Sequence, residues 1–125
     1  MRILLDTHAF IWALTNDKRL TKAARGIITN ADDVFISAAS IWEISIKSSI
    51  GKIDADPNAL LAEIPAVGFR ELPITATHAA AVSALPDLHR DPFDRLLVAQ
   101  AITEPLRLLT ADPVISQYTE LTIRI

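Results

Sequence analysis

Four acidic residues stand where a folded chain could bring them together: Asp6, Glu43, Asp94 and Asp112. Asp6 directly follows the apolar run Ile3–Leu5, and Asp112 comes shortly after another apolar run. Carboxylates that are crowded together repel one another and raise their own pKa values, and a bound divalent cation removes that penalty. Ligation by oxygen alone selects Mg²⁺ or Mn²⁺ over softer metals. The acids therefore predict a site for a hard cation at one edge of the fold.

The sequence lacks the residues that several other common kinds of active site require. The chain has no cysteine, which excludes zinc–thiolate sites and cysteine nucleophiles. Its 3 glycines stand far apart, whereas a phosphate-cradling loop needs several glycines close together. A histidine pair could cleave RNA without metal, but no spacing brings two histidines together here. A capping or packing role is expected for each of His8, His78 and His89.

The acids must be positioned by an alternation of short apolar strands with helices. We predict strands at residues 3–5, 34–36, 69–72, 106–109 and 121–125. Helices are predicted near residues 10–14 and over residues 21–29, 38–50, 57–67, 75–85, 91–103 and 113–118. This alternation is typical of an α/β fold in which helices cover both faces of a parallel sheet. Residues 1–125 are expected to form one domain, with the functional residues at the carboxyl ends of the strands.

Each acid also has a structural interpretation. Aspartate is a preferred helix N-cap, so Asp6, Asp91 and Asp112 could satisfy free backbone amides at helix starts. We favour the cap for Asp91, because an acid three residues later completes the pattern of a capping box. Glu43 could pair with Lys47 in the favourable helical orientation. Its apolar neighbours, however, make an unpartnered charge costly at that position.

The acids lie within four short segments: LLDTH at 4–8, SAASIWEI at 37–44, DPFDRLLVAQA at 91–101 and LTAD at 109–112. Each segment alone is a weak signal, whereas the ordered set is specific. In this order and at these intervals the segments resemble the PIN domain family, most closely the toxin ribonucleases of bacterial VapBC-type toxin–antitoxin pairs. The length of the chain matches a whole domain of that family.

The resemblance implies a Rossmann-like α/β/α sandwich with a five-stranded parallel sheet. It also implies Mg²⁺- or Mn²⁺-dependent hydrolysis of RNA phosphodiester bonds, a cognate antitoxin as partner, and a homodimer. The family's catalytic and metal-binding quartet falls on Asp6, Glu43, Asp94 and Asp112. Thr110 and Thr7 match hydroxyl residues that support the family's site, whereas Asp91 is an extra acid found in only part of the family.

Further candidates concern the RNA and the protein partner. A net charge of -3 argues mildly against nucleic acid, but without the four proposed ligands the acidic count falls from 15 to 11, against 12 Lys and Arg. The candidate RNA contacts are Arg95, Lys47 and Arg90. Trp12 and Trp42 are most simply core residues. In the resembled family, however, apolar residues beside the site receive the antitoxin, so the candidates for that groove are Phe10, Ile11 and Trp12.

Three other functions match parts of this pattern: structure-specific DNA cleavage, a catalytically inactive PIN fold that only binds, and a phospho-receiver domain. The added arch and helical segments of flap nucleases are missing, and the presence of all four acids disfavours an inactive fold. A receiver needs an acidic pair at the first strand and a lysine after the last, whereas Asp6 follows two leucines and the last lysine is Lys52. No signal peptide or membrane span is evident, so a cytoplasmic protein is expected.

Overall fold

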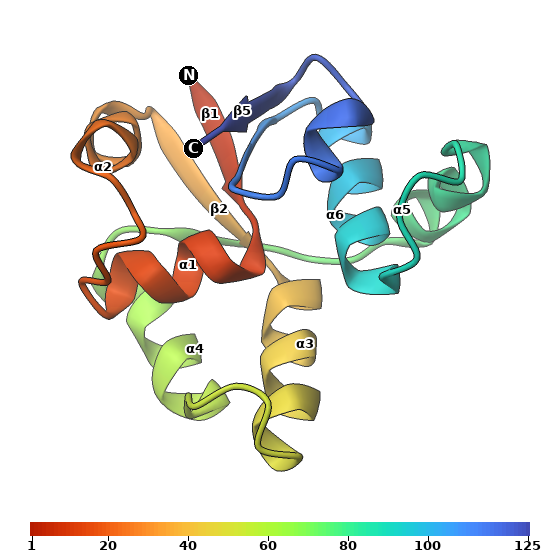
Figure 1. The fold of residues 1–125 in the computed structure, drawn as a ribbon. Helices are drawn as coiled ribbons and strands as arrows, with labels where there is room; N and C mark the ends of the chain where they lie inside the picture. Colours follow the sequence, from red (N-terminus) through yellow and green to blue (C-terminus); the bar gives the residue numbers. More distant parts are fainter.

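A five-stranded parallel sheet organises the computed structural model, which describes all of residues 1–125 (Figure 1). The strands lie in the order β3-β2-β1-β4-β5, and all four pairings are parallel. Their bounds are β1 Arg2–Leu5, β2 Asp33–Ser37, β3 Arg70–Leu72, β4 Arg107–Thr110 and β5 Thr122–Arg124. The predicted α/β class and the parallel sheet are confirmed.

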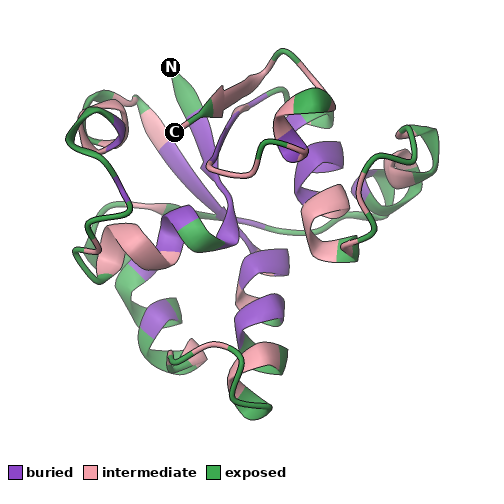
Figure 2. Cartoon of the chain, viewed as in Figure 1, coloured by how far each residue is buried: buried purple, intermediate pink, exposed green.

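The sheet separates two apolar cores, one on each face. In the central strand β1, Ile3 and Leu5 enter one core and Leu4 enters the other, because side chains alternate along a strand. The first core is covered by α1 (Thr7–Leu14), α3 (Ala38–Ser49) and α4 (Pro57–Ala66). The second is covered mainly by α6 (Pro92–Thr103), which lies across the central strands from α1 and α4 (Figure 1). Figure 2 shows buried residues concentrated in β1, β2, α3 and α6.

Several helices begin and end where local sequence signals predict. Thr21 caps α2 (Lys22–Asn30) by accepting the backbone N–H of Ala24. Asp56 caps α4, which begins with a proline. Gly51 follows the end of α3 with a φ of 76°, a left-handed conformation that favours glycine at this position. No helix of the structure has the length and apolar character required to cross a membrane.

Two predicted helices are shorter than expected. The segment over residues 75–85 divides into α5 (Ala76–Ala81) and the 3₁₀ helix η1 (Val82–Ala84). Leu85 then takes an extended backbone, as is favoured for the residue before a proline, here Pro86. The helix predicted over residues 113–118 contains only the short 3₁₀ helix η2 (Ile115–Gln117).

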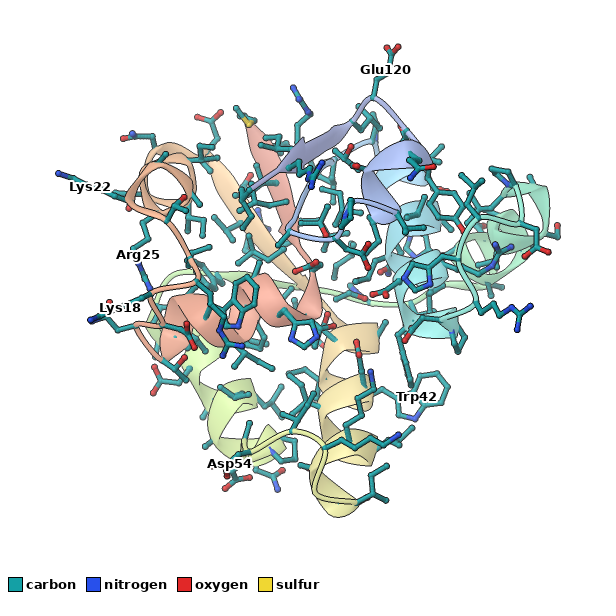
Figure 3. All side chains as sticks on the ribbon, in the orientation of Figure 1. Lys18, Lys22, Arg25, Trp42, Asp54 and Glu120 are labelled. Atoms are coloured by element: carbon teal, nitrogen blue, oxygen red, sulfur yellow. The ribbon has the colours of Figure 1, made fainter.

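Two aromatic predictions were wrong. Trp42 is not a core residue, because it is 56% exposed and meets Phe93 edge-on with ring centroids 4.9 Å apart. Figure 3 shows Trp42 extending from α3 on the side of α6. Phe10 is fully buried in the core covered by α1, so it cannot line an antitoxin groove. Ile11 and Trp12 are only partly buried and keep some exposed surface.

Candidate functional site

The five acids singled out from the sequence line one cavity of about 450 Å³: Asp6, Glu43, Asp91, Asp94 and Asp112. Asp6 follows β1 and Asp112 follows β4, and these two strands are neighbours in the sheet. Strand order reverses at this pair, since the chain moves from β1 to β2 and β3 and then returns to β4. Open α/β sheets bind their ligands at the carboxyl ends of the strands at such a point.

Asp6 is both a helix cap and a wall of the cavity. Its Oδ1 accepts the backbone N–H of Ala9 at 2.8 Å, and its Oδ2 accepts the Thr110 hydroxyl at 2.6 Å. Asp6 is only 5% exposed, and this burial raises the pKa of its carboxyl even though both hydrogen bonds lower it. The cap interpretation and the site interpretation of Asp6 are therefore compatible.

Glu43 reaches the cavity from α3 and is only 2% exposed. Its Oε1 accepts the Thr7 hydroxyl at 2.6 Å, and its Oε2 lies 2.5 Å from Lys47 Nζ. Lys47 Nζ also lies 3.8 Å from Asp91 Oδ2. The ion pair expected from helix spacing is present, but both of its side chains line the cavity. Thr7 supports Glu43 by direct contact.

The start of α6 supplies two acids with different environments. Asp91 caps the helix, since its Oδ1 accepts the N–H groups of Phe93 and Asp94 at 2.9 and 3.0 Å. Burial raises the pKa of the Asp94 carboxyl to about 7, and repulsion from three neighbouring carboxylates adds to this shift. The three carboxylates are those of Asp91, Glu43 and Asp6. Charges from three separate segments thus act on one side chain.

His89 belongs to this site, which corrects the expectation of a capping or packing role. Its Nε2 lies 3.2 Å from Oδ2 of Asp94 and 3.2 Å from Oδ2 of Asp112. The backbone N–H of Asp91 donates to Nδ1 at 3.1 Å, so the neutral ring carries its proton on Nε2. His89 therefore donates toward the two carboxylates. The available sequence signal was its place in the loop leading into α6, two residues before Asp91.

The other two histidines differ from each other. His78 forms a capping box with Thr75 at the start of α5, and its Nε2 lies 2.5 Å from Glu104 Oε2, so the predicted capping role is confirmed. His8 is exposed and lines the cavity, with its ring centroid 5.9 Å from that of Trp12.

Of the three candidate RNA contacts, only Lys47 lines the cavity. Arg95 instead fastens the loop that precedes α6. Its guanidinium donates to the carbonyl oxygens of Pro86 and Val82 at 3.0 and 3.3 Å, and to the Tyr118 hydroxyl at 3.2 Å. The structure thus gives Arg95 a structural role, and its contact with RNA stays a prediction. Arg90 is exposed outside the cavity.

The donor set fits a hard divalent cation. Carboxylate oxygens are the ligands that Mg²⁺ and Mn²⁺ prefer, and all five acids present them to one cavity. Ligand-type atoms of His89, Asp94 and Asp112 lie within 4.8 Å of one another. Burial first, and then repulsion from neighbouring carboxylates, raise the pKa of Asp94, and a bound cation would offset both effects. Because the Nε2 of His89 carries a proton, we expect this ring to orient carboxylates and not to ligate the ion.

The sequence profile of one known family matches nearly the whole chain: the PIN domain profile covers residues 3–121. Ribonuclease VapC22 of Mycobacterium tuberculosis (strain ATCC 25618 / H37Rv) is 35% identical to this chain over 112 residues. The matched region is 88% of this chain and 86% of that protein.

Several solved structures have a similar fold, including the following two. VapBC2 from Rickettsia felis, bound to a DNA fragment from its promoter, matches with a TM-score of 0.70 and 16% identity, covering 100% of this chain and 98% of the other. A toxin–antitoxin complex from Klebsiella pneumoniae matches with a TM-score of 0.66 and 16% identity, covering 98% and 99%. At this identity the similarity concerns the fold alone.

Proposed function

The chain belongs to the PIN domain family, and from this we propose that it is a Mg²⁺- or Mn²⁺-dependent endoribonuclease that acts as the toxin of a toxin–antitoxin pair. Two comparisons support the proposal. The relative that is 35% identical is named a ribonuclease. Structures of similar fold include a toxin–antitoxin complex and VapBC2.

The observation that carries the proposal is the meeting of four acids in one cavity: Asp6, Glu43, Asp94 and Asp112. They come from four separate segments, and two of them, Asp6 and Glu43, are almost completely buried. Buried carboxylates at this density call for a cation. An RNA phosphodiester is itself an anion, so these carboxylates can accept it only with a divalent cation bound among them.

We assign the roles as follows. Asp6 and Asp94 hold the cation, while Glu43 and Asp112 complete its shell or orient the attacking water. When bound, the cation polarises a phosphoryl oxygen, lowers the pKa of water and stabilises the leaving oxygen. Thr110 holds the Asp6 carboxylate in place, as its 2.6 Å hydrogen bond supports. A matching 2.6 Å bond from Thr7 orients Glu43.

A cognate antitoxin and a second copy of the chain are the proposed protein partners. The antitoxin candidates that remain on α1 are Ile11 and Trp12, since both keep exposed surface. Trp12 also lines the acidic cavity, so a segment seated on it would obstruct access to the acids. Co-purification with the product of the neighbouring reading frame tests the first partner, and light scattering tests the second.

The test of the activity is incubation of the purified protein with total RNA in Mg²⁺, in Mn²⁺ or in EDTA, with mapping of the cut ends. We expect discrete cuts with either metal and none in EDTA. Cleavage that persists in EDTA would contradict the metal dependence. Cutting of a DNA flap but not of RNA would favour the structure-specific DNA nuclease. Binding without any cutting would favour an inactive binding module.

A further inference from the structure

Lys47 holds a position in the cavity that the roles assigned so far do not explain. It is the one lysine or arginine among the lining residues. Its Nζ lies 2.5 Å from Glu43 Oε2 and 3.8 Å from Asp91 Oδ2. The Lys47 side chain is 28% exposed, whereas that of Glu43 is 3% exposed. The ammonium therefore lies between a buried carboxylate and the open part of the cavity.

Both carboxylate oxygens of Glu43 are engaged by the protein itself. The Thr7 hydroxyl donates to Oε1 at 2.6 Å, and the Lys47 ammonium donates to Oε2 at 2.5 Å. A divalent cation that takes Glu43 as a ligand must approach a carboxylate that already holds a positive charge at its Oε2. Because like charges repel strongly in a partly buried site, Lys47 and the cation compete for Glu43.

An ammonium group displaced from Glu43 can contact other groups in the same cavity. Lysine is a compact point charge on a flexible four-carbon stem, and it binds phosphate without the fixed geometry that arginine requires. Asp91 Oδ2 is the next acceptor, so an ammonium that leaves Glu43 stays within the cavity. A phosphodiester entering the same cavity would meet this ammonium as its only lysine or arginine partner there.

We propose that Lys47 exchanges partners during the catalytic cycle. It dissociates from Glu43 when a divalent cation binds, and it then contacts a phosphate of the RNA. The same residue thus opposes metal binding before substrate arrives and holds the substrate afterwards. The inference rests on the proposed function, because it requires that one cavity accept both a cation and RNA. An ordinary surface pair at this helical spacing would show neither effect.

Metal binding without RNA is the first measurement. Lys47→Met keeps the apolar stem and removes the charge, so we expect Mn²⁺ affinity, measured by isothermal titration calorimetry, to rise roughly threefold or more. Lys22→Met is the matched control, since it removes the same charge from the exposed start of α2. Figure 3 shows Lys22 pointing away from the protein at its outer edge. This control should keep the Mn²⁺ affinity of the wild type.

Cleavage at saturating Mn²⁺ is the second measurement. For Lys47→Met we expect a higher KM for an oligoribonucleotide. The slope of log(kcat/KM) against log[salt] should fall in magnitude by about 0.7, the amount expected for one lost phosphate contact on a single strand. Lys47→Arg keeps the charge and should restore the slope. Lys47→Gln keeps a donor for Glu43 and provides the same comparison if thermal melting shows the methionine variant to be unfolded.

The outcomes separate this inference from the function on which it rests. Unchanged or weaker Mn²⁺ binding by Lys47→Met would overturn the competition, even with a wild type that cleaves RNA as proposed. Tighter Mn²⁺ binding with an unchanged KM and salt slope would overturn the transfer to phosphate. A wild type that neither binds Mn²⁺ nor cleaves RNA would instead overturn the proposed function, and this inference with it.

Discussion

Thr110 donates its hydroxyl hydrogen to Asp6 Oδ2 at 2.6 Å, although the two residues are 104 positions apart in the sequence. Parallel pairing of β1 and β4 makes this contact, since Leu5 is in register with Leu109 and the next residues therefore come side by side. The same hydroxyl oxygen accepts the backbone N–H of Asp112 at 3.0 Å. Thr110 thus connects two of the proposed metal ligands at the ends of neighbouring strands.

Thr110→Val should weaken metal binding and also lower the stability of the fold. Valine fills the same space but leaves the Asp6 carboxylate without one of its two donors. We expect Mn²⁺ affinity to fall about 10- to 100-fold, as is typical when a residue supporting a metal ligand is lost. We also expect the free energy of unfolding to fall by roughly 1–3 kcal/mol. Calorimetry and urea unfolding measure the two effects. Thr110→Ser keeps the hydroxyl and should behave like the wild type; equal losses in both variants would refute the argument.

Asp6→Asn should abolish RNA cleavage while leaving the fold intact. Asparagine is as good an N-cap as aspartate, so its side-chain oxygen still accepts the Ala9 N–H. The negative charge offered to the cation is lost. RNA cleavage and circular dichroism check the two halves of this prediction. Activity that returns at several-fold higher Mn²⁺ would make Asp6 an auxiliary ligand.

In the absence of metal, ionisation of the Asp94 carboxyl should lower the free energy of unfolding. Its pKa in the folded protein is about 7, against the ordinary aspartate value of 3.8 in the unfolded chain. Between these values the folded state binds the extra proton, so the free energy of unfolding falls as pH rises. Each pKa unit corresponds to about 1.4 kcal/mol, which gives up to about 4 kcal/mol lost by pH 8.

Asp94→Asn removes this titration and provides the comparison. In EDTA, the stability of the variant relative to the wild type should increase steadily between about pH 4 and pH 7 and then level off. Urea unfolding at several pH values measures the difference. Parallel stability curves for the two proteins would show that the Asp94 carboxyl titrates alike in the folded and unfolded states.

Metal affinity should depend on pH over the same range. A cation that binds the Asp94 carboxylate must displace its proton below pH 7, so the apparent Mn²⁺ affinity should rise up to about tenfold per pH unit and level off above pH 7. Calorimetry in buffers of different ionisation enthalpy counts the protons released. We expect close to one proton per ion at pH 6 and few at pH 8. Proton release that does not change with pH would remove Asp94 from the ligand set.

Local signals in the sequence determined most of the secondary structure. Asp91 and Pro92 combine a capping side chain with a proline suited to the first helical position, and α6 begins there. Apolar runs such as Ile3–Leu5 predict buried strands because a parallel strand is covered on both faces. These effects act between residues that are neighbours in the sequence. Local sequence therefore suffices to detect them.

Burial could not be predicted in the same way. Phe10 and Trp42 are both aromatic residues on short helices, yet one is fully buried and the other is 56% exposed. The helix α3 carries apolar residues both toward the sheet, such as Ile44, and away from it, such as Ile46. A helix that is apolar on more than one side does not indicate by its pattern which side is packed.

By itself the sequence determined the chemistry of the site: its acids, an oxygen donor set and a family-like order of motifs. Only the tertiary structure decided which other groups share the cavity. His89 reaches Asp112 across 23 positions, and Lys47 reaches Asp91 from another helix. Those meetings depend on which strands pair and which helix faces pack. Such long-range choices reflect the burial of the whole core, and no local pattern of residues encodes them.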